Sequence, residues 1–272
     1  MPHYHNLRAS WAQQGPQGVV TRGTTGFNRL RRADRWLRYH SDVQRLLWHA
    51  EAPQAVDIGY GASFTTTVEW ARWLRQIHAD IDVIGVEIEP SRVLPPRDGV
   101  RFELGGFEMA GHRPHLARAF NVLRQYDVAD VHDAWVEVTS RLAPSGLFLE
   151  GTCDEIGRRC AWVLLDARGP RTLTLDWDPF FSERPSDIAE RLPKVLIHRN
   201  VPGEPIHDLL TAADRAWDFA AGWSPHGPRV RWRKALEMLA DDYPVTVPRR
   251  GIRDNVLTVP FSLVAPEYAD GF

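Results

Sequence analysis

The stretch Val56-Asp57-Ile58-Gly59-Tyr60-Gly61-Ala62-Ser63 decides the fold class, because it places two glycines directly after a short apolar run. Residues 54–58 have the length and composition of a buried strand, and a helical pattern begins near Thr65. A glycine turn between a strand and a helix lets the backbone approach a ligand closely, and the amides of the helix N-terminus face that ligand. The stretch therefore predicts the first strand, turn and helix of a nucleotide-binding α/β fold.

The chain after this stretch continues to alternate strands with helices. Apolar runs predict further strands at residues 83–86, 100–104, 119–123 and 147–150, and an apolar stripe over residues 131–142 predicts a helix before the last of them. This alternation predicts a doubly wound, mostly parallel sheet with helices on both faces.

The second half of the chain has a different pattern. Strands at 161–165 and 172–175 flank the turn 166–170 and predict an antiparallel edge hairpin, which gives a sheet of seven strands. Helices at 206–221 and 230–240 and a late strand at 256–259 follow among proline-rich loops. We expect three regions: an arginine-rich N-terminal arm and helix (1–49), a nucleotide-binding core (50–178) and a helical C-terminal cap (179–272).

Composition indicates an ordinary globular protein. Of the 272 residues, 43% are hydrophobic and 25% are charged, and the net charge of -2 gives no global reason to expect a nucleic acid or membrane partner. Cys153 and Cys160 match neither a redox pair nor a zinc motif, which favours reduced cysteines. With neither a signal peptide nor a long apolar stretch, we predict a cytoplasmic protein without membrane contact.

Three stretches resemble motifs of the class I methyltransferases, in the order of that family. Residues 56–61 resemble its first motif, residues 83–87 its acidic second-strand motif, and Leu142-Ala143-Pro144-Ser145-Gly146-Leu147 its Leu-x-Pro-Gly-Gly turn. Ser63 and Ser145 replace glycines of the family pattern. The resemblance spans roughly residues 53–176, and the chain beyond it is similar to uncharacterised actinobacterial members of the superfamily. It implies a Rossmann-like core that binds S-adenosylmethionine and a methyltransferase activity.

The expected cofactor residues follow the predicted strands. Glu87 ends the second strand, where a carboxylate can accept both hydroxyls of a ribose, and Glu89 is the alternative. The resemblance implies that Phe107 covers the adenine while a backbone amide or Glu108 reads its edge, with a plain core role for Phe107 as the alternative. It also implies that Asn121 faces the methionine part. The full expected set is Asp57, Gly59, Tyr60, Gly61, Glu87, Gly106, Phe107 and Asn121.

The acceptor side is expected at the end of the fourth strand. Arg124, Gln125 and Tyr126 are candidates for substrate contact, or they anchor the following helix. Methyl transfer from a sulfonium is an in-line displacement, so a general base is needed only where the acceptor must lose a proton. The candidate catalytic groups are Tyr126, Glu150 and His198, with Asp154 and Glu155 nearby. The spacing of His198, Glu204 and His207 fits no zinc signature, so we expect no metal.

An arginine cluster precedes the core and leaves the choice of partner open. Its arginines are Arg22, Arg29, Arg31, Arg32, Arg35 and Arg38, opposed by the single acid Asp34 and interleaved with Phe27 and Trp36. Such a cluster could bind RNA or another anionic acceptor, or it could form a helix whose arginines meet acids on the sheet.

The sequence predicts methyl transfer to an unidentified acceptor, with a small molecule favoured over RNA or protein. One alternative is an NAD(P)-dependent oxidoreductase, which the missing third glycine and the turn at 142–146 disfavour. The other is a non-catalytic RNA-binding module on a degenerate cofactor fold.

Overall fold

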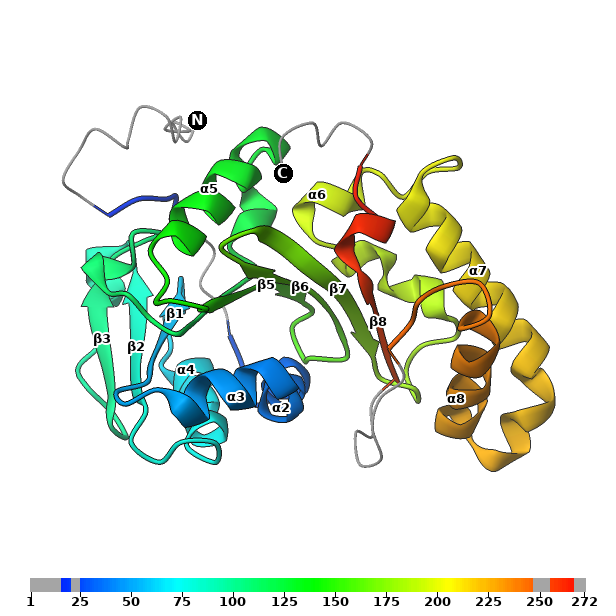
Figure 1. The fold of residues 1–272 in the computed structure, drawn as a ribbon, viewed down its shortest axis with the longest axis horizontal. Helices are drawn as coiled ribbons and strands as arrows, with labels where there is room; N and C mark the ends of the chain where they lie inside the picture. The colour runs from blue at the N-terminus through cyan, green and yellow to red at the C-terminus, as the bar shows by residue number, and fades with distance from the viewer. Residues whose placement is uncertain (1–15, 21–24, 247–254, 267–272) are drawn as a thin grey trace.

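The computed structural model describes residues 16–20, 25–246 and 255–266. Its centre is one sheet with the strand order β3-β2-β1-β4-β5-β6-β7-β8 (Figure 1). The strands are β1 (Gln54–Ile58), β2 (Asp82–Glu87), β3 (Val100–Leu104), β4 (Leu116–Phe120), β5 (Leu147–Cys153), β6 (Arg159–Asp166), β7 (Gly169–Trp177) and β8 (Asn255–Pro260). The α/β class is confirmed, but the sheet has eight strands where seven were expected, because the late strand pairs with β7.

The sheet divides into a parallel half and an antiparallel half. Strands β1 to β5 are parallel, and β1 lies between β2 and β4, with Ile58 level with both Val86 and Ala119. Strands β6, β7 and β8 each run antiparallel to their neighbour. Because β8 comes from the region 179–272, that region contributes to the same sheet as the predicted core.

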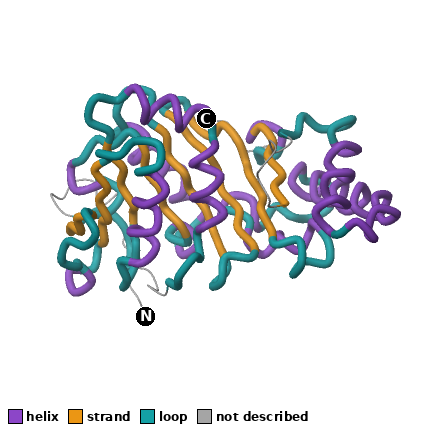
Figure 2. Tube along the Cα trace, turned by 90° about the horizontal axis from the view of Figure 1, so that it is seen from below, coloured by secondary structure: helices purple, strands orange, loops and turns teal. Residues whose placement is uncertain are grey.

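Helices cover both faces of the sheet, as expected (Figures 1 and 2). Helices α2 (Arg31–Tyr39), α3 (Ser41–His49) and α4 (Thr65–Leu74) pack on one face. Helices α5 (Val128–Ser140), α6 (Lys194–Ile197), α7 (Pro205–Phe219) and α8 (Pro228–Leu239) pack on the other. Short 3-10 helices are η1 (Pro90–Arg92), η2 (Met109–Gly111), η3 (Leu123–Gln125), η4 (Pro185–Arg191), η5 (Ala220–His226) and η6 (Phe261–Leu263).

A buried charge network explains why β4 begins three residues before the expected 119–123. Arg118 is fully buried in β4, and a charge at that position interrupts the apolar pattern. Its guanidinium donates to both carboxylate oxygens of Asp57 at 2.9 and 2.8 Å and to Asp34 of α2 at 2.6 Å. The network joins α2, β1 and β4, so it fastens the N-terminal helix to the centre of the sheet.

Cys153 and Cys160 form a disulfide, where the sequence favoured reduced cysteines. The two residues lie directly opposite each other on the antiparallel strands β5 and β6. Their spacing of seven residues gave no signal, because only the strand register brings them together. Among the residues that the structure describes, no helix is long and apolar enough to cross a membrane.

Candidate functional site

The carboxyl ends of the parallel strands meet at one edge of the sheet. Gly59 and Gly61 follow β1 with φ angles of +66° and +86°, a region that glycine adopts without steric cost. A Cβ on Gly59 would lie 2.7 Å from Cγ2 of Val122, so the turn also needs glycine for space. The expected glycine turn is therefore present between β1 and α4.

Glu87 ends β2 and binds this glycine turn. It is buried, and its Oε2 accepts a hydrogen bond from the Gly61 amide at 2.9 Å. Its Oε1 accepts from the Ile88 amide at 3.1 Å and the Glu89 amide at 3.4 Å. Each carboxylate oxygen has two lone pairs, so Oε2 can still accept one further hydrogen bond, such as one from a ribose hydroxyl. Glu89, the alternative, instead accepts from Ser91 in a turn.

The loop after β3 contributes an acceptor and a donor side by side. Glu108 accepts from the Gly106 amide through Oε1 at 2.8 Å. Phe107 is buried, and its ring lies 5.5 Å from the ring of Tyr126. Its backbone amide points in the same direction as the second carboxylate oxygen of Glu108, because both groups bind the same residue of another segment, Gln17.

That segment, residues 16–20, is called the strap here, and it lies across the site. Gln17 O accepts from the Phe107 amide at 2.9 Å, and the Gln17 amide donates to Glu108 Oε2 at 2.7 Å. The Val19 amide donates to the hydroxyl of Tyr126. A Cβ on Gly106 would lie 1.9 Å from Gln17 O, so the strap fills the space that this glycine leaves open.

The strap, the glycine turn, Glu87, Phe107 and Tyr126 line one cavity, which has a volume of only about 20 Å³. Pockets for ligands of cofactor size usually measure roughly 300–1,000 Å³. The surrounding residues fit an adenosine by their chemistry, since they offer an acidic acceptor, an amide donor, an aromatic cover and a ribose acceptor. The volume does not fit it while the strap is in place.

Two expected cofactor residues have different roles. The Asp57 carboxylate binds Arg118 and accepts from the Thr67 hydroxyl at 2.7 Å, so it orients β1 and α4 from the far side of the turn. The Tyr60 hydroxyl donates to Arg92 O at 2.7 Å, and burial raises the pKa of this phenol to about 12. Neither side chain lines the cavity, and both polar groups are bound within the protein.

Asn121 joins the ends of β4 and β5. Its φ of +61° places it in the left-handed region, which asparagine tolerates better than most residues. Its amide donates to Gly151 O at 2.8 Å, and its Oδ1 accepts from the Cys153 amide at 3.0 Å. The side-chain amide nitrogen of Asn121 is a further donor at this edge.

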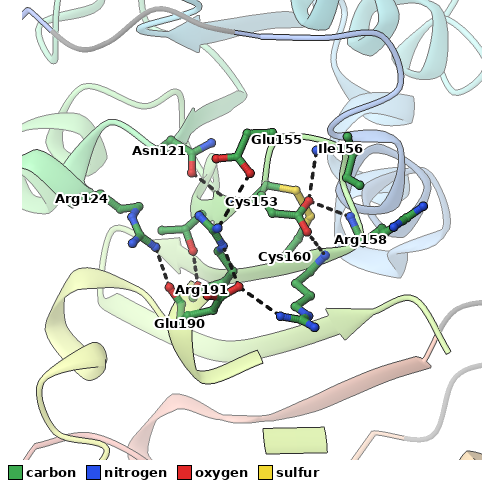
Figure 3. Close-up of polar contacts among 12 residues, drawn as sticks. Asn121, Arg124, Cys153, Glu155, Ile156, Arg158, Cys160, Glu190 and Arg191 are labelled. Carbon is green, nitrogen blue, oxygen red and sulfur yellow. Dashed lines mark hydrogen bonds and ion pairs between the residues drawn. A yellow bond between two sulfur atoms is a disulfide. The ribbon is translucent and has the colours of Figure 1, made fainter. Parts of the chain in front are cut away.

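Next to Asn121, arginines and acids from three segments form the acceptor edge, defined as Arg124, Glu155, Glu190 and Arg191 (Figure 3). Arg124 donates to Glu190 O at 2.9 Å. Arg191 lies 3.9 Å from the Glu155 carboxylate and 3.5 Å from that of Glu190. Burial, followed by repulsion from Arg191, lowers the pKa of Arg124. Gln125, the other expected substrate residue, is exposed.

The three candidate catalytic groups do not meet at this edge. Burial raises the pKa of the Tyr126 phenol well above its usual range, so Tyr126 stays protonated at neutral pH. Glu150 is fully buried within β5, and burial raises its pKa to about 8. His198 is exposed at the end of α6. Glu150 was expected at the mouth of the site, whereas the structure places it in the middle of β5 with 1% of its surface exposed.

The two nearby acids also have defined roles. Asp154 caps the turn between β5 and β6, accepting from the amides of Ile156, Arg158 and Arg159. Glu155 is 77% exposed and is thus the one candidate base with a free carboxylate face at the acceptor edge. Among the described residues there is no cluster suited to a metal ion.

The N-terminal arginines mostly bind this chain itself. Arg32 is buried and pairs with Asp176 at 2.7 Å and Asp178 at 3.0 Å. Arg29 donates to the carbonyls of Cys153 and Asp154, and Arg31 to that of Ile156. Arg38 donates to Gln76, and burial lowers the pKa of Arg35. Arg22 lies outside the described residues. This arrangement matches the helix interpretation of the cluster more closely than a free anion-binding patch.

Sequence reasoning missed the strap and Arg191. The strap is five residues of ordinary composition, and nothing in its local pattern indicates a position inside the fold. Arg191 ends η4, which reaches the site because the Thr152 hydroxyl donates to Arg191 O. Gln17 is 91 positions from Glu108, and Arg191 is 39 positions from Thr152, so only the tertiary structure reveals these contacts.

No family model matches the chain, and no curated protein matches it in sequence. Solved structures do match part of the fold. A putative type II methyltransferase from Anaeromyxobacter dehalogenans is 19% identical, with a TM-score of 0.32 over 44% of this chain and 46% of that one. The CcbJ methyltransferase from Streptomyces caelestis is 18% identical, with a TM-score of 0.30 over 57% and 74%.

A third match is the plantazolicin methyltransferase BpumL in complex with SAH, which is 8% identical, with a TM-score of 0.34 over 46% of this chain and 48% of that one. The chain spans less than two thirds of the length of the first structures it matches, from 29% to 56%. At these TM-scores the likenesses assign no activity to this chain.

Proposed function

We propose that this protein is a methyltransferase that uses S-adenosylmethionine. One observation carries the proposal: Gly59 after β1, the buried Glu87 after β2 and Phe107 after β3 line a single cavity at the carboxyl ends of three adjacent parallel strands, and the Glu108 carboxylate binds the amides of Gly106 and Gln17 from that lining. Ligands of open α/β sheets bind at this edge, beside the switch point where β1 lies between β2 and β4.

The topology favours this cofactor over a nicotinamide dinucleotide. A dinucleotide fold uses two nucleotide-binding halves with six parallel strands. In this chain β6 runs antiparallel to β5, so only β4 and β5 are parallel in the second half, which is one strand fewer than a second nucleotide-binding half needs. One adenosine site beside an open acceptor edge suits S-adenosylmethionine.

Each residue of the site has a task under this proposal. Glu87 would accept a ribose hydroxyl through Oε2, Glu108 and the Phe107 amide would bind the adenine edge, and Asn121 would donate toward the methionine part. The cofactor supplies an electrophilic methyl group on a sulfonium. The protein contributes alignment and exclusion of water, and Tyr126 and Phe107 form the apolar wall that excludes it.

We propose a small anionic acceptor, held through a carboxylate or phosphate by Arg124 and Arg191. These guanidiniums repel each other, and their acidic neighbours Glu155 and Glu190 are 77% and 55% exposed, so those ion pairs are weak. An anion between the arginines would be bound by charge-assisted hydrogen bonds. Arg29, Arg31 and Arg32 are engaged within the chain, which favours a small molecule over RNA.

Calorimetry with S-adenosylhomocysteine (SAH) and with NAD tests the cofactor. We expect binding of SAH with a stoichiometry of one and no binding of NAD, while binding of NAD alone would overturn the proposal. The acceptor is tested by transfer of labelled methyl groups to a panel of small carboxylates and phosphates and their neutral amides. Arg124→Gln should raise KM for the acceptor about tenfold, and Arg45→Gln, on the opposite edge of the sheet, should leave it unchanged.

A further inference from the structure

The strap presents the backbone N–H and C=O of one residue, Gln17, to the wall that the proposed function assigns to adenine. The Gln17 amide donates to Glu108 at 2.7 Å, and the carbonyl of the same residue accepts from the Phe107 amide at 2.9 Å. An adenine edge carries the same pair, an exocyclic amine that donates beside a ring nitrogen that accepts. The two groups therefore compete for the same pair of hydrogen bonds.

We infer that the strap is an intramolecular competitor of the cofactor, so that S-adenosylmethionine binds only when residues 16–20 leave the pocket. The inference rests on the proposed function. It is supported by volume as well as hydrogen bonding, because the cavity left beside the strap is about 20 Å³ and a Cβ on Gly106 would touch Gln17 O at 1.9 Å.

The backbone of the strap packs tightly in the pocket, whereas the side chain of Gln17 has an unpaired polar atom there. Gly18 has a φ of +145°, and a Cβ there would lie 2.9 Å from the Tyr126 hydroxyl, so glycine is required for the fit. Gln17 is 8% exposed, and within the described part of the chain its Oε1 has no hydrogen-bond partner. A buried unpaired carbonyl reduces the net stability of the seated strap, which makes its release less costly.

The expected consequence is a cofactor affinity that depends on the strap. When only a fraction of molecules has an open pocket, the apparent Kd equals the intrinsic Kd divided by that fraction. A variant that weakens the strap should therefore bind the cofactor more tightly, because a larger fraction of molecules has an open pocket.

Two strap variants and one control separate backbone from side-chain effects. Gln17→Pro removes the amide that donates to Glu108 and keeps the carbonyl. Gly18→Ala places a methyl group against Tyr126 in a conformation that alanine disfavours. Gln17→Ala keeps both backbone hydrogen bonds and serves as the control.

The experiment is calorimetric titration of SAH into the full-length wild type and these three variants. We expect Gln17→Pro and Gly18→Ala to bind SAH about tenfold more tightly than wild type, because a hydrogen bond to a carboxylate is worth about one decade or more in an equilibrium constant. Gln17→Ala should bind SAH no more tightly than wild type, because it keeps both backbone hydrogen bonds and removes the buried unpaired carbonyl. Binding by the two strap variants alone would support the inference most strongly.

Unchanged or weaker binding by both strap variants would overturn the inference and leave the methyltransferase proposal intact. Weaker binding would identify the strap as a cover that closes over bound cofactor. Failure of wild type and all variants to bind SAH would overturn the proposed function, and with it the competition.

Discussion

The parallel and antiparallel halves of the sheet differ in what they can do for a ligand. In the parallel half every strand ends at the same edge, and the residues that follow β1, β2 and β3 line one cavity. In the antiparallel half, successive strands run in opposite directions. At the edge where β5 ends with Cys153, β6 therefore begins and β7 ends. Those residues bind the protein, as Asp176 and Asp178 bind Arg32.

Strand direction therefore determines how many loops lie at the edge where a ligand can bind. The parallel half supplies enough loops for one nucleoside, and the antiparallel half closes the sheet and fastens α2 to it. If this division is correct, substitutions in the two halves should change different measurements.

The largest expected effect is on the charge network that holds the parallel half to α2. Arg118→Met should lower the free energy of unfolding by about 3–5 kcal/mol, because it leaves Asp34 and Asp57 buried without their cation. Arg101→Met, which removes a 46% exposed arginine paired with Asp82, should cost less than about 1 kcal/mol. Urea unfolding measures both, and equal losses would contradict the role of the network.

The next effect concerns Glu150 on β5, the strand shared by the two halves. Its folded pKa of about 8 lies above its ordinary value of 4.5, so the folded state holds the proton more tightly than the unfolded state. Between these values the contribution of Glu150 to stability falls as pH rises, by roughly 1 kcal/mol per pH unit.

Glu150→Gln should remove this dependence. The unfolding free energies of wild type and variant should therefore lie close together near pH 5, with the variant more stable near pH 8. Chemical unfolding at several pH values tests this, and parallel curves over the whole range would show that Glu150 does not titrate in the fold as described.

A smaller effect is expected where the antiparallel half begins. Replacing Cys153 and Cys160 together by serine opens a short loop, and the chain-entropy relation gives a loss of about 2.5 kcal/mol of stability. Affinity for SAH should change less than threefold, because neither cysteine lines the cavity. A loss of SAH binding in a folded double variant would contradict the hypothesis that only the parallel half binds the ligand.

The smallest expected effect lies in the parallel half and appears in binding. Glu87→Gln should weaken SAH binding about tenfold, because an amide lacks the charge that strengthens hydrogen bonds from ribose hydroxyls. Glu89→Gln, two residues later and outside the cavity, is the matched control and should bind SAH as wild type does. Equal affinities in both variants would remove Glu87 from the proposed site.

Prediction from sequence worked best where the signal was local. The glycine turn, the strand β1 and the acid at the end of β2 were placed correctly, because apolar runs and glycines act on neighbouring residues. Prediction failed for the start of β4, where buried Arg118 interrupts the apolar run. It failed also for Glu150, because a single acid at the end of an apolar run does not show that its side chain is buried. It also failed for the cysteines, whose pairing depends on the register of two strands.

The sequence by itself determined an α/β sheet with a ligand edge after its first strands, since backbone propensity and hydrophobic periodicity are properties of short segments. The packing of the layers was needed to show that Asp57 binds Arg118 and Tyr60 binds Arg92, that η4 brings Arg191 to this edge, and that the strap lines the pocket. The physical reason is that these contacts join segments distant in the chain. Their energies depend on burial and on paired donors and acceptors, which exist only after the layers have packed.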